Sequence, residues 1–164
     1  VTLNWAMAGN LEQQGDIEGA IAVYERLYAQ DSNSAVIANN LASLISSFKE
    51  DDESLQRAYA IARRLRGTEV PQFQDTYGWI AARLGNYQEA LEYLEPAAAA
   101  LPQDPIVQYH LAWTYAIIGR EEPALDAYLA ALELIDTSGR SLPFRDEIVS
   151  EIARLEAAQS ATSD

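Results

Sequence analysis

Apolar residues recur along this chain with two nested periods. Over short stretches they stand three and four positions apart, as Met7 and Leu11 do, which places them on one face of a helix. No long stretch alternates apolar and polar residues as a strand would. The local setting of Met7 then returns at Leu41, Tyr77 and Leu111, at intervals of 34, 36 and 34 residues. The pattern therefore predicts an all-α protein made of repeated helix pairs.

Each repeated unit is interrupted near its middle. The interruptions are Gly15-Asp16, Gly85-Asn86 and Gly119-Arg120, and glycine suits the left-handed residue that ends a helix. Small residues at Ala20, Ala58, Ala90 and Ala124 follow these breaks or the equivalent position. We expect them to let the two helices of a unit approach closely.

These features resemble the tetratricopeptide repeat, whose 34-residue unit carries a Gly-Asp or Gly-Asn turn between two helices. The closest matches are residues 15–21, GDIEGAI, and 85–91, GNYQEAL. The resemblance covers roughly residues 1–138 and divides them into units 1–34, 35–70, 71–104 and 105–138. It implies a right-handed α-solenoid of antiparallel helix pairs.

The second unit departs from the pattern because its turn has no glycine. We expect an exposed loop from Ser46 to Ser54, which is either a tolerated insertion or a docking loop. Four arginines share the expected second helix of this unit, and we expect them to form a solvated convex face. They are Arg57, Arg63, Arg64 and Arg66.

After residue 138 the repeat stops. Pro143 is expected to open a last helix within 139–159, whose apolar stripe of Phe144, Ile148, Ile152 and Leu155 caps the final repeat. Residues 160–164 are expected to be a disordered tail. No equivalent cap precedes Val1, so we expect a fragment of a longer chain with repeats missing upstream.

Composition excludes several classes of function. The net charge of −14 argues against nucleic acid, which binds clustered Lys and Arg. The absence of Cys excludes disulfides and thiolate metal sites, and no apolar run approaches the 18 or so residues of a membrane span. His110 is the only histidine, and beside apolar Leu111 we expect it to be a structural hydrogen-bonding residue. We therefore predict a protein that is not an enzyme and has no cofactor or metal.

The family resemblance implies that the first helix of each unit lines a concave groove. Helical geometry then assigns most of a peptide-binding set on these helices, and the family's carboxylate-binding positions add Asn40. The set is Trp5, Glu12, Asn39, Asn40, Ser43, Asp75, Trp79, Arg83, Tyr109 and Trp113. All three tryptophans belong to it. They are either exposed binding anchors or rings that fold over and pack against the next repeat.

Two finer resemblances bear on the kind of partner and on the cellular location. Some members of the family clamp the C-terminal carboxylate of chaperones with Lys, Arg and Asn, and of the corresponding residues here only Asn40 fits. That mode is therefore not expected. The segments 39–42, 75–80 and 109–112 resemble the C-terminal repeats of exported bacterial proteins linked to exopolysaccharide, which leans toward the cell envelope or periplasm, with the cytoplasm open.

The function expected from these features is an interaction scaffold that binds a peptide or protein segment in its groove. Asp75 and Glu12 beside the indoles favour a partner that carries Lys or Arg next to an apolar side chain. Two alternatives stay open: a structural segment that self-associates through its uncapped N-terminal end, and a regulatory arm of a larger enzyme or envelope lipoprotein.

Overall fold

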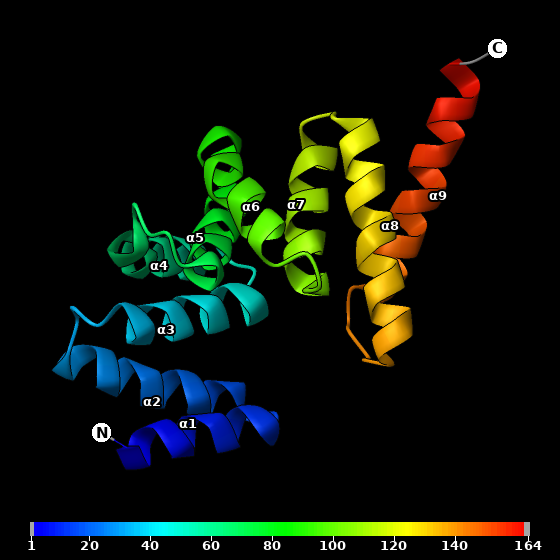
Figure 1. The fold of residues 1–164 in the computed structure, drawn as a ribbon. Coiled ribbons are helices and arrows are strands. Elements are labelled where there is room, and N and C mark those ends of the chain that lie inside the picture. The colour runs from blue at the N-terminus through cyan, green and yellow to red at the C-terminus, as the bar shows by residue number, and fades with distance from the viewer. Residues whose placement is uncertain (1, 163–164) are drawn as a thin grey trace.

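A computed structural model describes residues 2–162, and over this range the chain is helical with no strand, as predicted (Figure 1). The α-helices are α1 Thr2–Gln13, α2 Ile17–Gln30, α3 Ala35–Phe48, α4 Asp52–Ala62, α5 Pro71–Arg83, α6 Tyr87–Ala100, α7 Pro105–Ile117, α8 Glu121–Ser138 and α9 Arg145–Thr162. A short 3₁₀ helix, η1 Arg63–Leu65, extends α4. None of the described helices is long and apolar enough to cross a membrane.

Three of the tight turns follow the sequence prediction. Gly15, Gly85 and Gly119 have φ angles of 77°, 81° and 76°, which residues with a side chain rarely adopt. Asp16 then caps α2 by accepting a hydrogen bond from the Gly19 backbone N–H at 3.0 Å. The glycine breaks therefore mark where each first helix ends.

The turn of the second unit corrects the prediction. Helix α3 continues to Phe48, and Ser46 is buried within it rather than exposed in a loop. Only residues 49–51 connect α3 to α4, where the Asp51 side chain accepts a hydrogen bond from the Ser54 N–H at 2.8 Å. The expected loop from Ser46 to Ser54 is wrong because an aspartate cap, without a glycine, ends the turn within three residues.

Paired helices approach closely through small residues. The alanines at positions 20, 58, 90 and 124 are all fully buried, as predicted. At Gly78 in α5 a Cβ atom would lie 2.8 Å from Leu94 Cγ and 3.0 Å from the Ala90 carbonyl oxygen of α6. The spacing of α5 and α6 therefore depends on the absence of a side chain at this position.

The apolar core consists of two clusters that meet in α5. Tyr77 and Ile80 belong to the first cluster, with α1 to α4, whereas Trp79 and Ala82 belong to the second, with α6 to α9. In Figure 1, α1, α2 and α3 run across the view while α7 and α8 run along its vertical direction. The stack of helices thus turns where α5 joins the two clusters.

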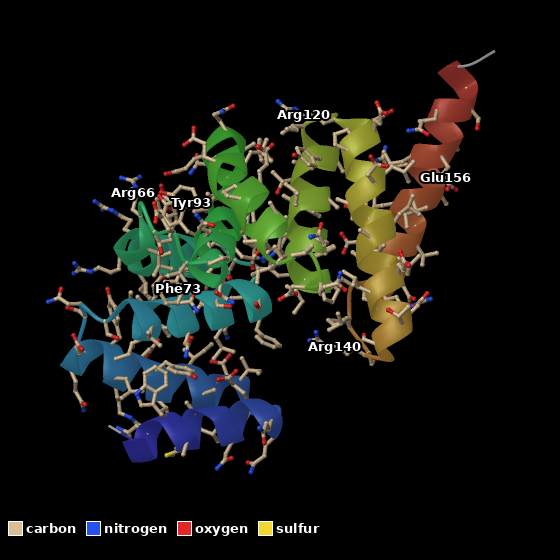
Figure 2. The ribbon with its side chains drawn as sticks, in the orientation of Figure 1. Arg66, Phe73, Tyr93, Arg120, Arg140 and Glu156 are labelled. Carbon is tan, nitrogen blue, oxygen red and sulfur yellow. The ribbon has the colours of Figure 1, made fainter. Side chains whose placement is uncertain are left out.

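All four arginines of the second unit are exposed, as expected of a solvated face, and one of them also takes part in a polar network between helices. The Arg66 side chain is exposed, and its Nε donates to the Tyr77 hydroxyl at 3.0 Å while its guanidinium pairs with Glu89 at 3.2 Å. Tyr77 and Tyr59 also donate to Glu89, at 2.6 and 3.0 Å. Figure 2 shows Arg66 and Tyr93 close together at this junction.

Burial by itself would raise the pKa of Glu89. The hydrogen bonds from Tyr77, Tyr59 and Arg66 outweigh it and hold the pKa below the ordinary value of 4.5. A second member of the arginine set, Arg57, pairs with Glu25 at 2.7 Å, so it joins α4 to α2. Two of the four arginines therefore connect helices.

Helix α9 lies against α8 and completes the second cluster. Ile148 and Leu155 are fully buried and Ile152 nearly so, as the predicted stripe requires. The helix begins at Arg145, two residues later than Pro143, and it runs to Thr162. This corrects the expected disorder at 160–162, which are helical, while residues 163 and 164 lie outside the described range.

Candidate binding surface

The ten residues predicted to bind a peptide lie on α1, α3, α5 and α7, and we call the side of these helices that carries them the inner face. The structure divides them into three groups. Three are buried, two form hydrogen bonds or ring contacts that hold neighbouring helices, and the others line two pockets near the ends of the face.

Trp79 is a packing residue in this structure. Its ring stacks on His110 with centroids 4.2 Å apart and planes 11° from parallel, and only 8% of it is exposed. Asp75 is buried as well, with its carboxylate 2.8 Å from His110 Nδ1. His110 has the structural hydrogen-bonding role expected of it, and Trp79 follows the second alternative, packing against the next repeat. Asp75, which was expected beside an exposed indole, is buried.

Arg83 connects α5 to α3 on the same side of the molecule. Its guanidinium lies 5.6 Å from the Trp79 ring centre and donates to the Ser46 carbonyl oxygen at 2.7 Å. That carbonyl belongs to the last turn of α3, where backbone oxygens lack helical partners. Arg83 therefore satisfies a helix end and covers the outer side of Trp79.

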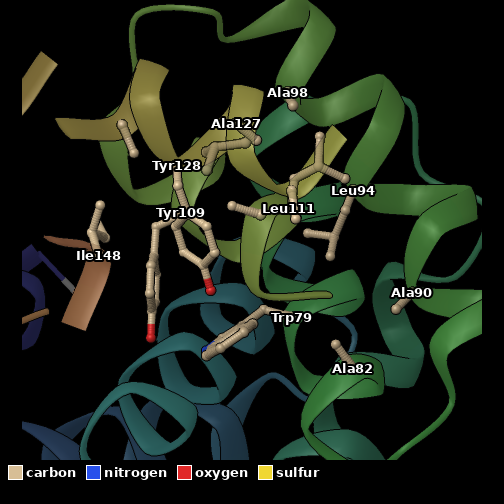
Figure 3. Close-up of a cluster of buried hydrophobic side chains, with 14 of the residues drawn as sticks. Trp79, Ala82, Ala90, Leu94, Ala98, Tyr109, Leu111, Ala127, Tyr128 and Ile148 are labelled. Carbon is tan, nitrogen blue, oxygen red and sulfur yellow. The ribbon is translucent and has the colours of Figure 1, made fainter. Parts of the chain in front are cut away.

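Tyr109 is covered by the segment that leads into α9. Phe144 stacks on its ring with centroids 4.2 Å apart, and its hydroxyl donates to Glu147 at 3.1 Å. Burial, with the nearby Glu147 charge, raises the pKa of Tyr109. Figure 3 shows Trp79, Tyr109 and Tyr128 gathered in one aromatic group beside Ile148. Tyr109 is therefore closed off, contrary to expectation.

Trp113 remains open to solvent on one side. It is half-buried and meets Trp79 edge to face at 5.3 Å, and it lines a pocket of about 200 Å³ between α7 and α9. We call this the C-terminal pocket, lined by Trp113, Ala116, Ile117, Tyr128, Glu147, Glu151 and Arg154. Its acidic wall on α9 was missed, because nothing in the repeat pattern links α9 to the inner face.

A second pocket, of about 290 Å³, lies between α1, α2 and α3. We call this the N-terminal pocket, lined by Glu12, Tyr24, Asn39, Asn40, Ser43, Leu44, Ser47 and Phe48. Four of the predicted residues meet here. Trp5 lies behind it, edge-on to Tyr24 at 5.8 Å. Tyr24, Leu44, Ser47 and Phe48 were outside the predicted set. Helical geometry could have found Leu44 and Phe48, which follow Asn40 at intervals of four along α3.

Neither pocket has the composition of a metal site. Within residues 2–162 no group of three His, Cys, Asp or Glu side chains could hold a metal ion. The C-terminal pocket combines two carboxylates and an arginine with apolar and aromatic side chains, and the N-terminal pocket combines one carboxylate with amides, hydroxyls and apolar side chains.

Residues 78–139 match a family model described as tetratricopeptide repeat. No curated protein sequence matches the chain. Several solved structures are similar to this chain, and each of the following three is matched over most of its length. MamA 41-end from Desulfovibrio magneticus RS-1 is 17% identical, with a TM-score of 0.61 and coverage of 96% of both chains. TTC0263, a thermophilic TPR protein of Thermus thermophilus, is 23% identical, with a TM-score of 0.65 and coverage of 92% and 80%.

The third structure is YrrB, described as a TPR protein with an unusual peptide-binding site. It is 20% identical, with a TM-score of 0.62, and the match covers 93% of this chain and 74% of YrrB. At these identities the likeness shows a shared fold. The fold outside residues 78–139 is thus the same helical-pair solenoid.

Proposed function

Since the chain is a tetratricopeptide-repeat protein, we propose that it is a non-catalytic scaffold that binds a segment of a partner protein along its inner face. Repeats of this family are generally interaction scaffolds without catalytic activity. The observation that carries the proposal is the C-terminal pocket, where an open tryptophan and an exposed aliphatic side chain meet charged residues of α9.

The C-terminal pocket has the features of a binding anchor. Ile117 is 53% exposed although it is a large apolar residue, and it stands one helical turn after half-buried Trp113. Glu147 and Glu151 flank this apolar floor. A partner side chain that fills it would bury apolar area in a hollow, and clefts of this kind concentrate binding energy.

The charge of the site favours a basic partner. The chain carries a net charge of −14, and of the three charged residues that line the C-terminal pocket two are carboxylates. Arg154 is paired with Glu151 at 2.8 Å, while Glu147 accepts from Tyr109. We therefore expect a partner segment in which an apolar side chain is followed or preceded by Lys or Arg.

Peptide selection tests this proposal directly. Random peptides displayed on phage are selected on the purified protein and then compared on Trp113→Ala, Ile117→Asp and a control, Val149→Asp, which changes an exposed residue of α9 outside the pocket. Selected peptides should lose affinity for both pocket variants by about 30-fold, or about 2 kcal/mol, and keep it for the control.

The result that overturns the proposal is specific to the pocket. Peptides that bind the wild type and both pocket variants equally well would show that the inner face at α7 is not the binding surface. Failure to select any peptide from libraries of basic and apolar composition would remove the proposal altogether.

A further inference from the structure

The N-terminal pocket contains a chain of hydrogen bonds that runs in one direction. Asn39 Nδ2 donates to Asn40 Oδ1 at 3.2 Å, and Asn40 Nδ2 donates to the Tyr24 hydroxyl at 3.4 Å. Glu12 lines the same pocket as Tyr24, and burial together with the Glu12 charge raises the pKa of the Tyr24 hydroxyl. An ionised carboxylate only accepts hydrogen bonds, so beside Glu12 the Tyr24 hydroxyl turns its hydrogen toward the carboxylate and accepts from Asn40.

The other end of this row of hydrogen bonds, at Asn39, has an unpaired acceptor. Because Asn39 uses its amide hydrogens toward Asn40, its carbonyl oxygen is the free end, and that atom is buried with no hydrogen-bond partner. It is the one such side-chain atom found among the residues that the structure describes. An acceptor left in this state costs stability, and a donor that enters the pocket would relieve the cost as the amide turns toward it.

The two ends of this row of hydrogen bonds therefore need the same kind of ligand. Glu12 is an exposed carboxylate with capacity to accept further hydrogen bonds, and Asn39 lacks a donor. A guanidinium or ammonium group supplies several donors and a positive charge. An anion or a neutral acceptor would instead meet the Glu12 charge without satisfying Asn39.

The apolar part of the pocket fits the stem of such a side chain. Phe48 is 56% exposed at the end of α3, and Leu44 lies one turn earlier on the same wall. Lys and Arg commonly pack their methylene stems on apolar surface while the charged head meets polar groups. A pocket of about 290 Å³ with one apolar wall and one acceptor wall matches this shape.

We propose that the N-terminal pocket receives an Arg or Lys side chain of the partner segment, with the cationic head at Glu12 and Asn39 and the stem against Phe48. This inference rests on the proposed function, since it places a second subsite on the same inner face. It also replaces the expected contribution of Asp75, which is buried against His110.

The test uses a minimal probe and its neutral isostere. The side-chain amide signals of Asn39 and Asn40 are followed by NMR while Nα-acetyl-arginine amide is added, and then while Nα-acetyl-citrulline amide is added. The arginine compound should cause saturable shifts at both amides. The citrulline compound, which has the same shape without the charge, should bind about fivefold more weakly or not at all, as expected for loss of one exposed ion pair.

Two variants and one control sharpen the result. Glu12→Gln should weaken the arginine compound about fivefold, whereas Glu156→Gln, with the same change of net charge on distant α9, should not (Figure 2). Asn39→Leu removes the unpaired acceptor, so it should weaken binding while the melting temperature stays unchanged or rises. A merely structural asparagine would instead lower the melting temperature.

Each contrary result overturns the inference. These results are equal binding of citrulline and arginine, equal effects of the two Glu→Gln variants, and a clear loss of stability in Asn39→Leu with unchanged binding. If selected peptides still require Trp113 while the arginine compound does not bind, this inference fails and the proposed function stands. If the arginine compound binds but no peptide requires the C-terminal pocket, the proposed function fails instead.

Discussion

The contact between α5 and α6 depends on one residue that has no side chain. A methyl group at Gly78 would lie within 3.0 Å of Leu94 and of the Ala90 carbonyl oxygen, and the carbonyl belongs to a helix backbone that cannot move alone. Gly78→Ala should therefore lower the free energy of unfolding by about 1–3 kcal/mol, although alanine is the better helix former. Urea denaturation of the variant measures this directly.

Gly9 in α1 provides the matched control. Nothing lies within 4 Å of a Cβ atom at this position, and its backbone is helical with no positive φ. Gly9→Ala should stabilise the protein by up to about 1 kcal/mol, because only the backbone entropy of the unfolded chain changes. Equal effects of the two substitutions would contradict the close approach at Gly78.

The two inner-face tryptophans of the second cluster should respond differently to truncation. Trp79 is sandwiched between His110 and Arg83, so Trp79→Ala should cost about 3–5 kcal/mol of stability. Trp113 is open on one side, so its truncation should cost less stability and act mainly on binding. Thermal unfolding of both variants gives the comparison, and a smaller loss for Trp79→Ala than for Trp113→Ala would contradict the assigned roles.

The packing of α9 can be tested with a pair of neighbouring residues, one buried and one exposed. Ile148 is fully buried against the second cluster, and Val149 beside it is 42% exposed. Ile148→Ala should lower the free energy of unfolding by about 2–5 kcal/mol, whereas Val149→Ala should change it by less than about 0.5 kcal/mol. Similar unfolding midpoints for the two variants would show that α9 does not hold the end of the repeat stack.

The helices could be predicted from the local sequence, because the turn glycines and the spacing of apolar residues that mark them lie within a few residues of one another. The glycine turns at 15, 85 and 119 and the buried alanines follow directly from the period. The turn of the second unit was wrongly predicted to be a long loop, because the prediction relied on glycine to mark a short turn. This turn is short but is capped by Asp51 instead. The extra residues of this unit lengthen the end of α3 and, for the most part, the start of α4 instead of forming a loop.

The binding surface was harder to predict because exposure depends on neighbours far away in sequence. Helical geometry placed Trp79 and Tyr109 on the correct side of their helices. Whether a ring faces water there is decided by His110 of the next unit and by Phe144 beyond the last repeat. By contrast, the predicted residues Glu12, Asn39 and Asn40 do line a pocket.

The two halves of the protein are held together by the network around Glu89 as well as by apolar contact. Since its pKa in the folded state is lowered below 4.5, the carboxylate contributes its full stabilisation above that pH and loses it as the pH falls through the lowered value. Glu89→Gln should cost about 1.5–3 kcal/mol near neutral pH. Its deficit relative to wild type should shrink in acid, which melting curves from pH 7 to pH 3 would record.

Glu92, an exposed residue of the same helix, serves as the control. Glu92→Gln should leave both the melting temperature and its dependence on pH close to those of the wild type, because surface substitutions of this kind have small effects. A deficit of Glu89→Gln that is constant over the whole range of pH would show that the ionised carboxylate does not support the junction.

Helix α5 supplies residues to both apolar clusters, with Tyr77 and Ile80 in one and Trp79 and Ala82 in the other. Either half can lose its outer helices while the remaining half still holds α5 in place. Its backbone amides are therefore released to solvent only when both halves open at once. In native-state hydrogen exchange, α5 should exchange last, and its exchange should report global unfolding. In a solenoid whose ends fray independently, the bend would then be the most durable point rather than the weakest.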